Sequence, residues 1–191
     1  MHSFFYSMQT NLLWTGQEYR SSENCIIKTN ATANDIRSVI IGKYEENIFD
    51  VSYQIKTHQN WETVFLELHS RIGNQSQHIQ LESDGKSNWK MDGKKATQFD
   101  GCIDIDISLT PLTNTLPINR LQLKPGEEQQ IRVIYIDVLA QQIKPVLQKY
   151  IRLSGRVYRY ENVPNDFEAK ISVDEQGFVV DYPPLFVSTK V

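Results

Sequence analysis

The feature that most constrains the fold of this chain is an alternation of apolar and polar residues with a period of two. In residues 49–56, the odd positions from Phe49 to Ile55 are apolar and the even positions from Asp50 to Lys56 are polar. A β-strand with one buried face has this period, because successive side chains point to opposite faces. The pattern recurs in three further segments: residues 64–68, 79–81 and 167–173.

One segment is apolar on both faces. In residues 131–139 only Arg132 and Asp137 interrupt the apolar run, which predicts a central strand covered on both sides. Turn sequences separate the strand segments: Asp84-Gly85, Asp92-Gly93, Pro125-Gly126 and Asp174-Glu175-Gln176-Gly177. Short strands joined by such hairpin turns predict a mostly antiparallel sheet.

Helical sequence is scarce. Residues 110–123 are the best candidate, with Thr115 as the N-cap and Pro117 in the first turn. Residues 141–150 are a weaker alternative, because Pro145 would interrupt a helix there. We therefore expect a mainly β (α+β) fold, in which a long sheet curls around one short helix and leaves few exposed edges. Three apolar side chains of this helix should be buried against the sheet: Leu116, Ile118 and Leu121.

The size and charge of the chain exclude several classes of protein. The 191 residues fit one domain, to which we assign residues 12–191, with residues 1–11 as a flexible leader or an extra edge strand. A net charge of −3 offers no electrostatic basis for binding nucleic acid. No apolar stretch reaches the roughly 18 residues of a membrane span, so integral membrane association is not expected. The 2 cysteines lack metal-ligand spacing, which predicts buried free thiols and a cytoplasmic protein.

The most unusual segment is residues 100–120, with the sequence DGCIDIDISLTPLTNTLPINR. As a strand, it places Asp104 and Asp106 on one face, roughly 7 Å apart. Such a pair can bind a hard cation, act as an acid–base pair, or accept hydrogen bonds from a sugar or head group. The alternative is structural, with both carboxylates facing water or paired with Arg or Lys. The local pattern alone favours the structural role.

This segment resembles the signature of the bacterial family described as putative glycolipid-binding. The signature is a Gly-Cys-x-Asp-x-Asp strand followed by Thr-Pro-x-Thr-Asn-Thr-Leu-Pro-Ile-x-Arg-Leu, and residues 101–121 match it. Further matches, such as Trp61-Glu62-Thr63 and GFVVDYP at residues 177–183, extend the resemblance over residues 12–186. Asn119 departs from it, since relatives often carry a second basic residue there, and this weakens the idea of an anion clamp. The resemblance implies a spiral β-roll, with the sheet wrapped around a single helix, and a lipid-carrier-like binding role.

The leading hypothesis is a non-enzymatic protein that binds an amphiphile, such as a glycolipid or an acyl-chain molecule, in the curled sheet. The apolar part of the ligand would lie on the concave face, and four residues would meet its polar head: Asp104, Asp106, Asn114 and Arg120. Further candidates for this ligand site are Trp89, Thr113, Tyr150 and Tyr160. Each has a structural alternative: Asn114 can cap the helix, the aromatic residues can be ordinary core, and Arg120 can fork onto a carboxylate.

Two other functions remain open. The chain can be a hydrolase or lyase that uses Asp104 and Asp106 as an acid–base pair, or a structural module whose motif serves only folding and dimerisation. No nucleophile elbow, P-loop or dinucleotide fingerprint is present. The 4 histidines show no metal-ligand spacing, so neither a cofactor nor a metal is expected. A homodimer is compatible with all three hypotheses.

Overall fold

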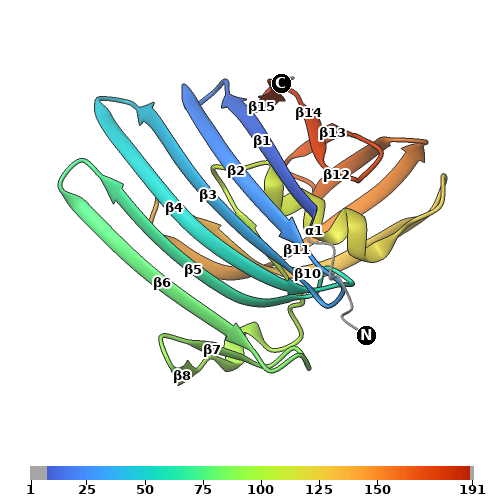
Figure 1. Ribbon diagram of the computed structural model, residues 1–191, viewed down its shortest axis with the longest axis horizontal. Helices are drawn as coiled ribbons and strands as arrows, with labels where there is room; N and C mark the ends of the chain where they lie inside the picture. The colour runs from blue at the N-terminus through green and yellow to red at the C-terminus, as the bar shows by residue number, and fades with distance from the viewer. Residues whose placement is uncertain (1–7, 190–191) are drawn as a thin grey trace, which may run out of the picture.

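The computed structural model describes residues 8–189, which form one large sheet and one α-helix (Figure 1). The first strands are β1 (Met8–Gly16), β2 (Ser21–Thr29), β3 (Ala33–Tyr44), β4 (Asn47–His58), β5 (Thr63–Ile72), β6 (Gln75–Ser83), β7 (Trp89–Met91) and β8 (Lys94–Lys95). A 3-10 helix η1 (Thr97–Phe99), strand β9 (Asp104–Ile107) and helix α1 (Leu112–Leu121) follow. The remaining strands are β10 (Glu128–Asp137), β11 (Gln142–Ser154), β12 (Val157–Val163), β13 (Glu168–Val173), β14 (Val179–Tyr182) and β15 (Phe186–Ser188).

All 15 strands belong to one sheet with the order β8-β7-β6-β5-β4-β3-β2-β1-β15-β14-β13-β12-β11-β10-β9. Strands β9 and β10 are parallel, and every other neighbouring pair is antiparallel. The pairing of β1 with β15 joins the two halves of the sheet. The sheet is curled and open, with β8 and β9 as its two edges. The prediction of a long, curled, mostly antiparallel sheet is confirmed.

The curl covers β9 and β10 on both faces, although they end the strand order. Ile134 and Ile136 pack into a first core with the concave face of β1–β6. Val133 points the other way, into a second core with the inner faces of β11–β14. In Figure 1, β10 and β11 accordingly lie behind β2–β5. The prediction for residues 131–139 is therefore right about burial and wrong about position, because the sheet folds over its own end instead of placing β10 at its middle.

Helix α1 lies inside the curl and starts earlier than the sequence predicts. It begins at Leu112, so Thr115 is an interior residue and Pro117 is the sixth residue of the helix. The N-cap assignments of Thr115 and Asn114 are wrong, because Pro111 is the N-cap and both residues lie inside the helix. Thr110 Oγ1 accepts a hydrogen bond from the Leu112 amide at 3.0 Å. The prediction of buried side chains is confirmed for Leu116 and Ile118, which are 0% and 3% exposed, whereas Leu121 is only half-buried.

Two further local predictions are corrected. The segment 141–150 is not a helix: residues 142–150 form part of β11, with Lys144, Val146, Gln148 and Tyr150 alternating towards the inside. Pro145 fits there because this part of β11 pairs only with β10. The pairing of β11 with β12 begins at Leu147, and a proline is tolerated at a sheet edge. The Pro125-Gly126 turn joins α1 to β10, so it is not a hairpin turn.

The ends of the domain and the cysteines can be compared with the predictions as well. Residues 8–11 lie in β1 and pair only with β2, since the β15 contact covers Trp14–Gly16, and residues 1–7 lie outside the described residues. Cys25 and Cys102 are buried free thiols, as expected. The helix that the structure describes between residues 112 and 121 is too short to cross a membrane, and no other described helix is long enough.

Candidate functional site

The motif at residues 104–120 forms β9 and the helix that follows it, and both of its carboxyl groups point inside the curl. Asp106 stands opposite Tyr135 of β10, and Asp104 stands opposite Val133. The intervening Ile105 faces the first core. The alternation on β9 therefore sends its isoleucines to one side and its carboxylates to the other, as the sequence predicts.

Asp104 is held by Arg120 of α1. The guanidinium donates from Nε to Asp104 Oδ1 at 3.1 Å and from a terminal nitrogen to Oδ2 at 2.5 Å. The two side chains are only 1% and 13% exposed. Burial raises the pKa of Asp104, and the neighbouring guanidinium opposes this rise. The expected fork from Arg120 onto a carboxylate is thus present, and it ties the end of the helix to β9.

Asp106 is buried among neutral donors instead. Thr113 Oγ1 donates to Oδ1 at 2.9 Å, and Gln148 Nε2 donates to Oδ2 at 2.6 Å. Among the residues that the structure describes, neither lysine nor arginine pairs with this carboxyl. Burial raises the pKa of Asp106 because these two hydrogen bonds only partly offset the loss of water. Asp104 and Asp106 are thus only two residues apart, but a cation pairs with the carboxylate of Asp104 and not with that of Asp106.

A cavity of about 530 Å³ opens beside Asp106. It lies between the start of α1, the inner faces of β10–β12 and β14, and the β1–β2 turn. Its polar wall comprises Glu18, Asp106, Ser108, Thr110, Asn114, Lys144, Gln148, Asn162 and Asp166. Its aromatic and aliphatic wall comprises Tyr19, Tyr135, Tyr160, Tyr182, Phe167, Phe186, Ile107, Val146, Leu147, Val163, Pro164 and Leu185.

Three of the eight predicted ligand residues line this cavity: Asp106, Asn114 and Tyr160. Tyr150 lies behind Asn114 and donates to its Oδ1 at 2.9 Å. Thr113 donates a hydrogen bond to Asp106, and Arg120 forms an ion pair with Asp104. Thr113, Asp104 and Arg120 do not line the cavity. Trp89 lies in the first core, where it is 1% exposed and donates to the Cys102 carbonyl at 2.8 Å. These side chains support the cavity wall or fill the core.

Several residues that line the cavity belong to none of the sequence motifs described above. Gln148 and Asn162 stand directly opposite each other on β11 and β12. Lys144 is the one cation among the described residues of the wall. The sequence signal for Lys144 and Gln148 is the alternation of even-numbered residues along β11. Pro145 and the competing helical pattern obscured this signal.

A second buried polar cluster lies on the opposite side of Thr110 from the cavity. Glu23 of β2 is 3% exposed and accepts hydrogen bonds from Ser38 Oγ and Tyr53 Oη, both at 2.6 Å. Tyr53 Oη also lies 3.3 Å from Thr110 Oγ1. Burial raises the pKa of Glu23 to about 7. This cluster supports Thr110 from the first core, and the sequence analysis did not identify it.

The arrangement of the two aspartates does not favour acid–base chemistry by the pair. Asp104 forms an ion pair away from the cavity, and Asp106 alone borders the space that a substrate would occupy. Acid–base catalysis needs both groups within reach of the reacting atoms. What the geometry offers is a set of hydrogen-bonding groups around a half-apolar cavity.

Comparisons with known proteins agree with this architecture. The family model described as putative glycolipid-binding matches residues 11–188. The crystal structure of a DUF1089 family protein from Pseudomonas aeruginosa is similar, with a TM-score of 0.75 and 29% identity over 98% of this chain and 94% of that chain. A β-barrel-like protein with the domain of unknown function DUF1849, from Brucella abortus, shares the fold at 9% identity, with a TM-score of 0.50 over 98% of this chain and 96% of that chain. No curated protein matches.

Proposed function

This chain belongs to the family described as putative glycolipid-binding, and on that premise we propose that it binds a glycolipid, without chemical turnover, in the cavity beside Asp106. The observation that carries the proposal is the cavity itself. Its volume of about 530 Å³ falls within the range of small-molecule sites, which runs from about 300 to 1,000 Å³. Both polar and apolar side chains line it, which suits an amphiphilic ligand.

The charge of the polar wall favours a neutral head group. Three acidic side chains, Glu18, Asp106 and Asp166, line the cavity against the single cation of Lys144. An anionic head such as a phosphate would be repelled by this balance. Sugar hydroxyls both donate and accept, so they match carboxylate, amide and tyrosine groups together.

The apolar part of the ligand would contact the aliphatic and aromatic side chains of the same cavity. Val146, Phe167 and Leu185 line the cavity and also pack against the second core. Burial of hydrocarbon contributes about 25 cal/mol for each Å² removed from water, so even a short chain adds affinity to the sugar contacts. The proposed site thus differs from the predicted one, which included Asp104 and Arg120 and placed the apolar part of the ligand on the concave face.

The test uses octyl β-D-glucoside below its micelle concentration, with glucose and 1-octanol as separated halves, and saturation-transfer NMR as the readout. We expect transfer to both ends of the glucoside and weaker transfer to each half alone. Val146→Trp should weaken the transfer by narrowing the cavity. Leu153→Trp is the matched control, because Leu153 lies on the same strand, is 41% exposed and does not line the cavity.

Two outcomes would contradict the proposal. Equal transfer in Val146→Trp and wild type would place the ligand elsewhere. Release of glucose and octanol from the glucoside, detected in the same tube, would replace binding by hydrolysis and revive the enzymatic alternative.

A further inference from the structure

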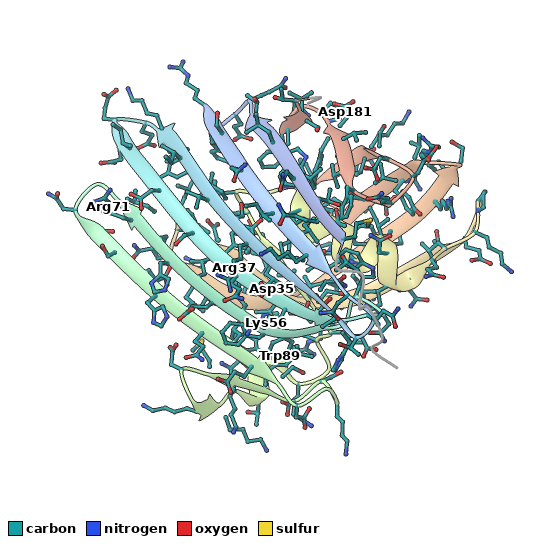
Figure 2. The ribbon with its side chains drawn as sticks, viewed as in Figure 1. Asp35, Arg37, Lys56, Arg71, Trp89 and Asp181 are labelled. Atoms are coloured by element: carbon teal, nitrogen blue, oxygen red, sulfur yellow. The ribbon has the colours of Figure 1, made fainter. Side chains whose placement is uncertain are left out.

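We propose that the outer face of β5 and β6 carries a binding site for a divalent transition metal of the zinc class, formed by Glu67, His69 and His78. His69 and His78 stand directly opposite each other in the antiparallel pairing. Glu67 lies two residues before His69 and therefore shares its face. Figure 2 shows the outer face of this half of the sheet, on which Arg37 occupies the same cross-strand row as Glu67.

The donor atoms already lie close to one another. Glu67 Oε1 is 3.4 Å from His78 Nε2 and 3.8 Å from His69 Nε2. One ligand atom of each residue lies within 4.8 Å of the others. In tetrahedral zinc sites with bonds of about 2.0–2.2 Å, neighbouring donors are separated by roughly 3.3–3.6 Å. Small side-chain rotations would bring the three donors to that spacing.

The sheet prearranges the two imidazoles. Their rings stack with a centroid separation of 4.4 Å and an interplanar angle of 23°. Directly opposed residues on antiparallel strands have Cβ atoms about 4.5–5.5 Å apart, so the backbone fixes the distance between the rings. Less conformational freedom is then lost on binding than in a site assembled from loops.

The chemistry of the donors selects the metal. Imidazole nitrogens suit zinc and neighbouring transition metals, whereas magnesium and calcium prefer oxygen ligands alone. Within residues 8–189, the side chains at ion-pair distance from the Glu67 carboxylate are His69 and His78. No lysine or arginine of these residues pairs with it, so the carboxylate is available to a metal ion. Three protein ligands on an exposed face leave a fourth position for water or an incoming ligand.

The test is isothermal titration calorimetry of the full chain with zinc chloride, after dialysis against a chelator. We expect one zinc ion per chain. Glu67→Gln, His69→Gln and His78→Gln should each weaken binding roughly tenfold or more, because each removes one of three ligands. His58→Gln is the matched control, since His58 lies at the end of β4 and outside the cluster, and it should bind zinc like the wild type.

Three results would overturn the inference. The first is no binding of zinc by the wild type. The second is binding by the three ligand variants as tight as that of His58→Gln, and the third is the same isotherm with magnesium chloride as with zinc. Circular dichroism of each variant shows whether its fold is retained, and we expect it to be, because all three side chains are at least 40% exposed.

Discussion

The concave face of β2–β6 and the inner face of β10–β12 are built by the same alternation, but they carry different side chains. On the first face, Ile36, Ile55 and Leu66 meet with 0% exposure, and apolar contacts fill the space. On the second face, Tyr135 and Gln148 alternate with apolar residues, and a cavity remains. Each region also contains a buried carboxyl that pairs with no lysine or arginine among residues 8–189: Glu23 of β2 in the first region, and Asp106 of β9, next to β10, in the second.

This difference separates two roles of one sheet. A filled apolar face supplies stability, since close packing leaves few voids. A face with tyrosines and amides leaves gaps between rigid rings and offers hydrogen bonds to whatever enters. The curl brings the two regions together on β9 and β10, because Ile105, Ile134 and Ile136 pack into the filled region whereas Asp106 and Tyr135 line the cavity.

The largest effect is expected at the ion pair that anchors α1 between the two regions. Arg120→Met leaves Asp104 buried without its cation, and breaking a buried pair in this way costs about 3–5 kcal/mol. Urea-induced unfolding measures the loss. The control is Arg71→Met, whose partner Asp50 is 44% exposed, and exposed pairs contribute about 0–1 kcal/mol. Arg120→Met combined with Asp104→Leu should recover most of the loss, and failure to do so would show that Arg120 acts through something other than the pair.

The two cores can be compared through the leucines of the helix. Leu116 is 0% exposed in the first core, so Leu116→Ala should cost about 2–5 kcal/mol. Leu121 is half-buried beside the second core, so Leu121→Ala should cost clearly less. Thermal and urea unfolding of both variants give the measurement. Equal losses would mean that the second core is packed as tightly around the helix as the first.

The pH dependence of stability tests the carboxyl of the filled region. The pKa of Glu23 rises from 4.5 to about 7 on folding, so the folded state binds the proton more tightly than the unfolded state. Its contribution is favourable below pH 4.5 and is lost as the pH rises towards 7, by an amount on the order of 3 kcal/mol. Glu23→Gln should flatten this part of the stability curve and be more stable than wild type at pH 8.

Asp104 and Asp106 also have raised pKa values and act in the same direction. The difference between wild type and Glu23→Gln therefore isolates the contribution of Glu23. Glu82→Gln, at an exposed position of β6, should leave the curve unchanged. A stability difference between wild type and Glu23→Gln that stays constant between pH 5 and 7 would contradict the assignment.

The sequence predicts local features well because their causes are local. The alternation of β4 depends on the strand period over a few residues, and the helix period directs Arg120 away from the core towards a carboxylate of the preceding strand. The sequence left open whether that carboxylate is Asp104 or Asp106. The position of β10 and the cavity depend on the twist accumulated over the whole sheet, which no local pattern contains. Gln148 and Glu23 illustrate the consequence: each is a polar residue on an inward face, and only the assembled structure shows which neighbours it meets.

The smallest effects compare one tyrosine hydroxyl from each region. Tyr53 Oη donates to the buried Glu23, and Tyr160 Oη donates to Asn162 at the cavity wall, both at 2.6 Å. At pH 8, where Glu23 is mostly ionised, Tyr53→Phe should cost about 1.5–3 kcal/mol, the range for hydrogen bonds to charged groups. Tyr160→Phe should cost about 0.5–1.5 kcal/mol, because its partner is neutral and the cavity can supply water in its place.

Binding should show the opposite order. Tyr160→Phe removes a donor from the cavity and should weaken the transfer to octyl β-D-glucoside, whereas Tyr53→Phe, which lies in the first core, should leave it unchanged. Unfolding curves and saturation-transfer NMR on the same two variants give all four values. If Tyr53→Phe weakens binding as much as Tyr160→Phe, the contact between Tyr53 and Thr110 couples the filled region to the cavity, and the two regions do not act independently.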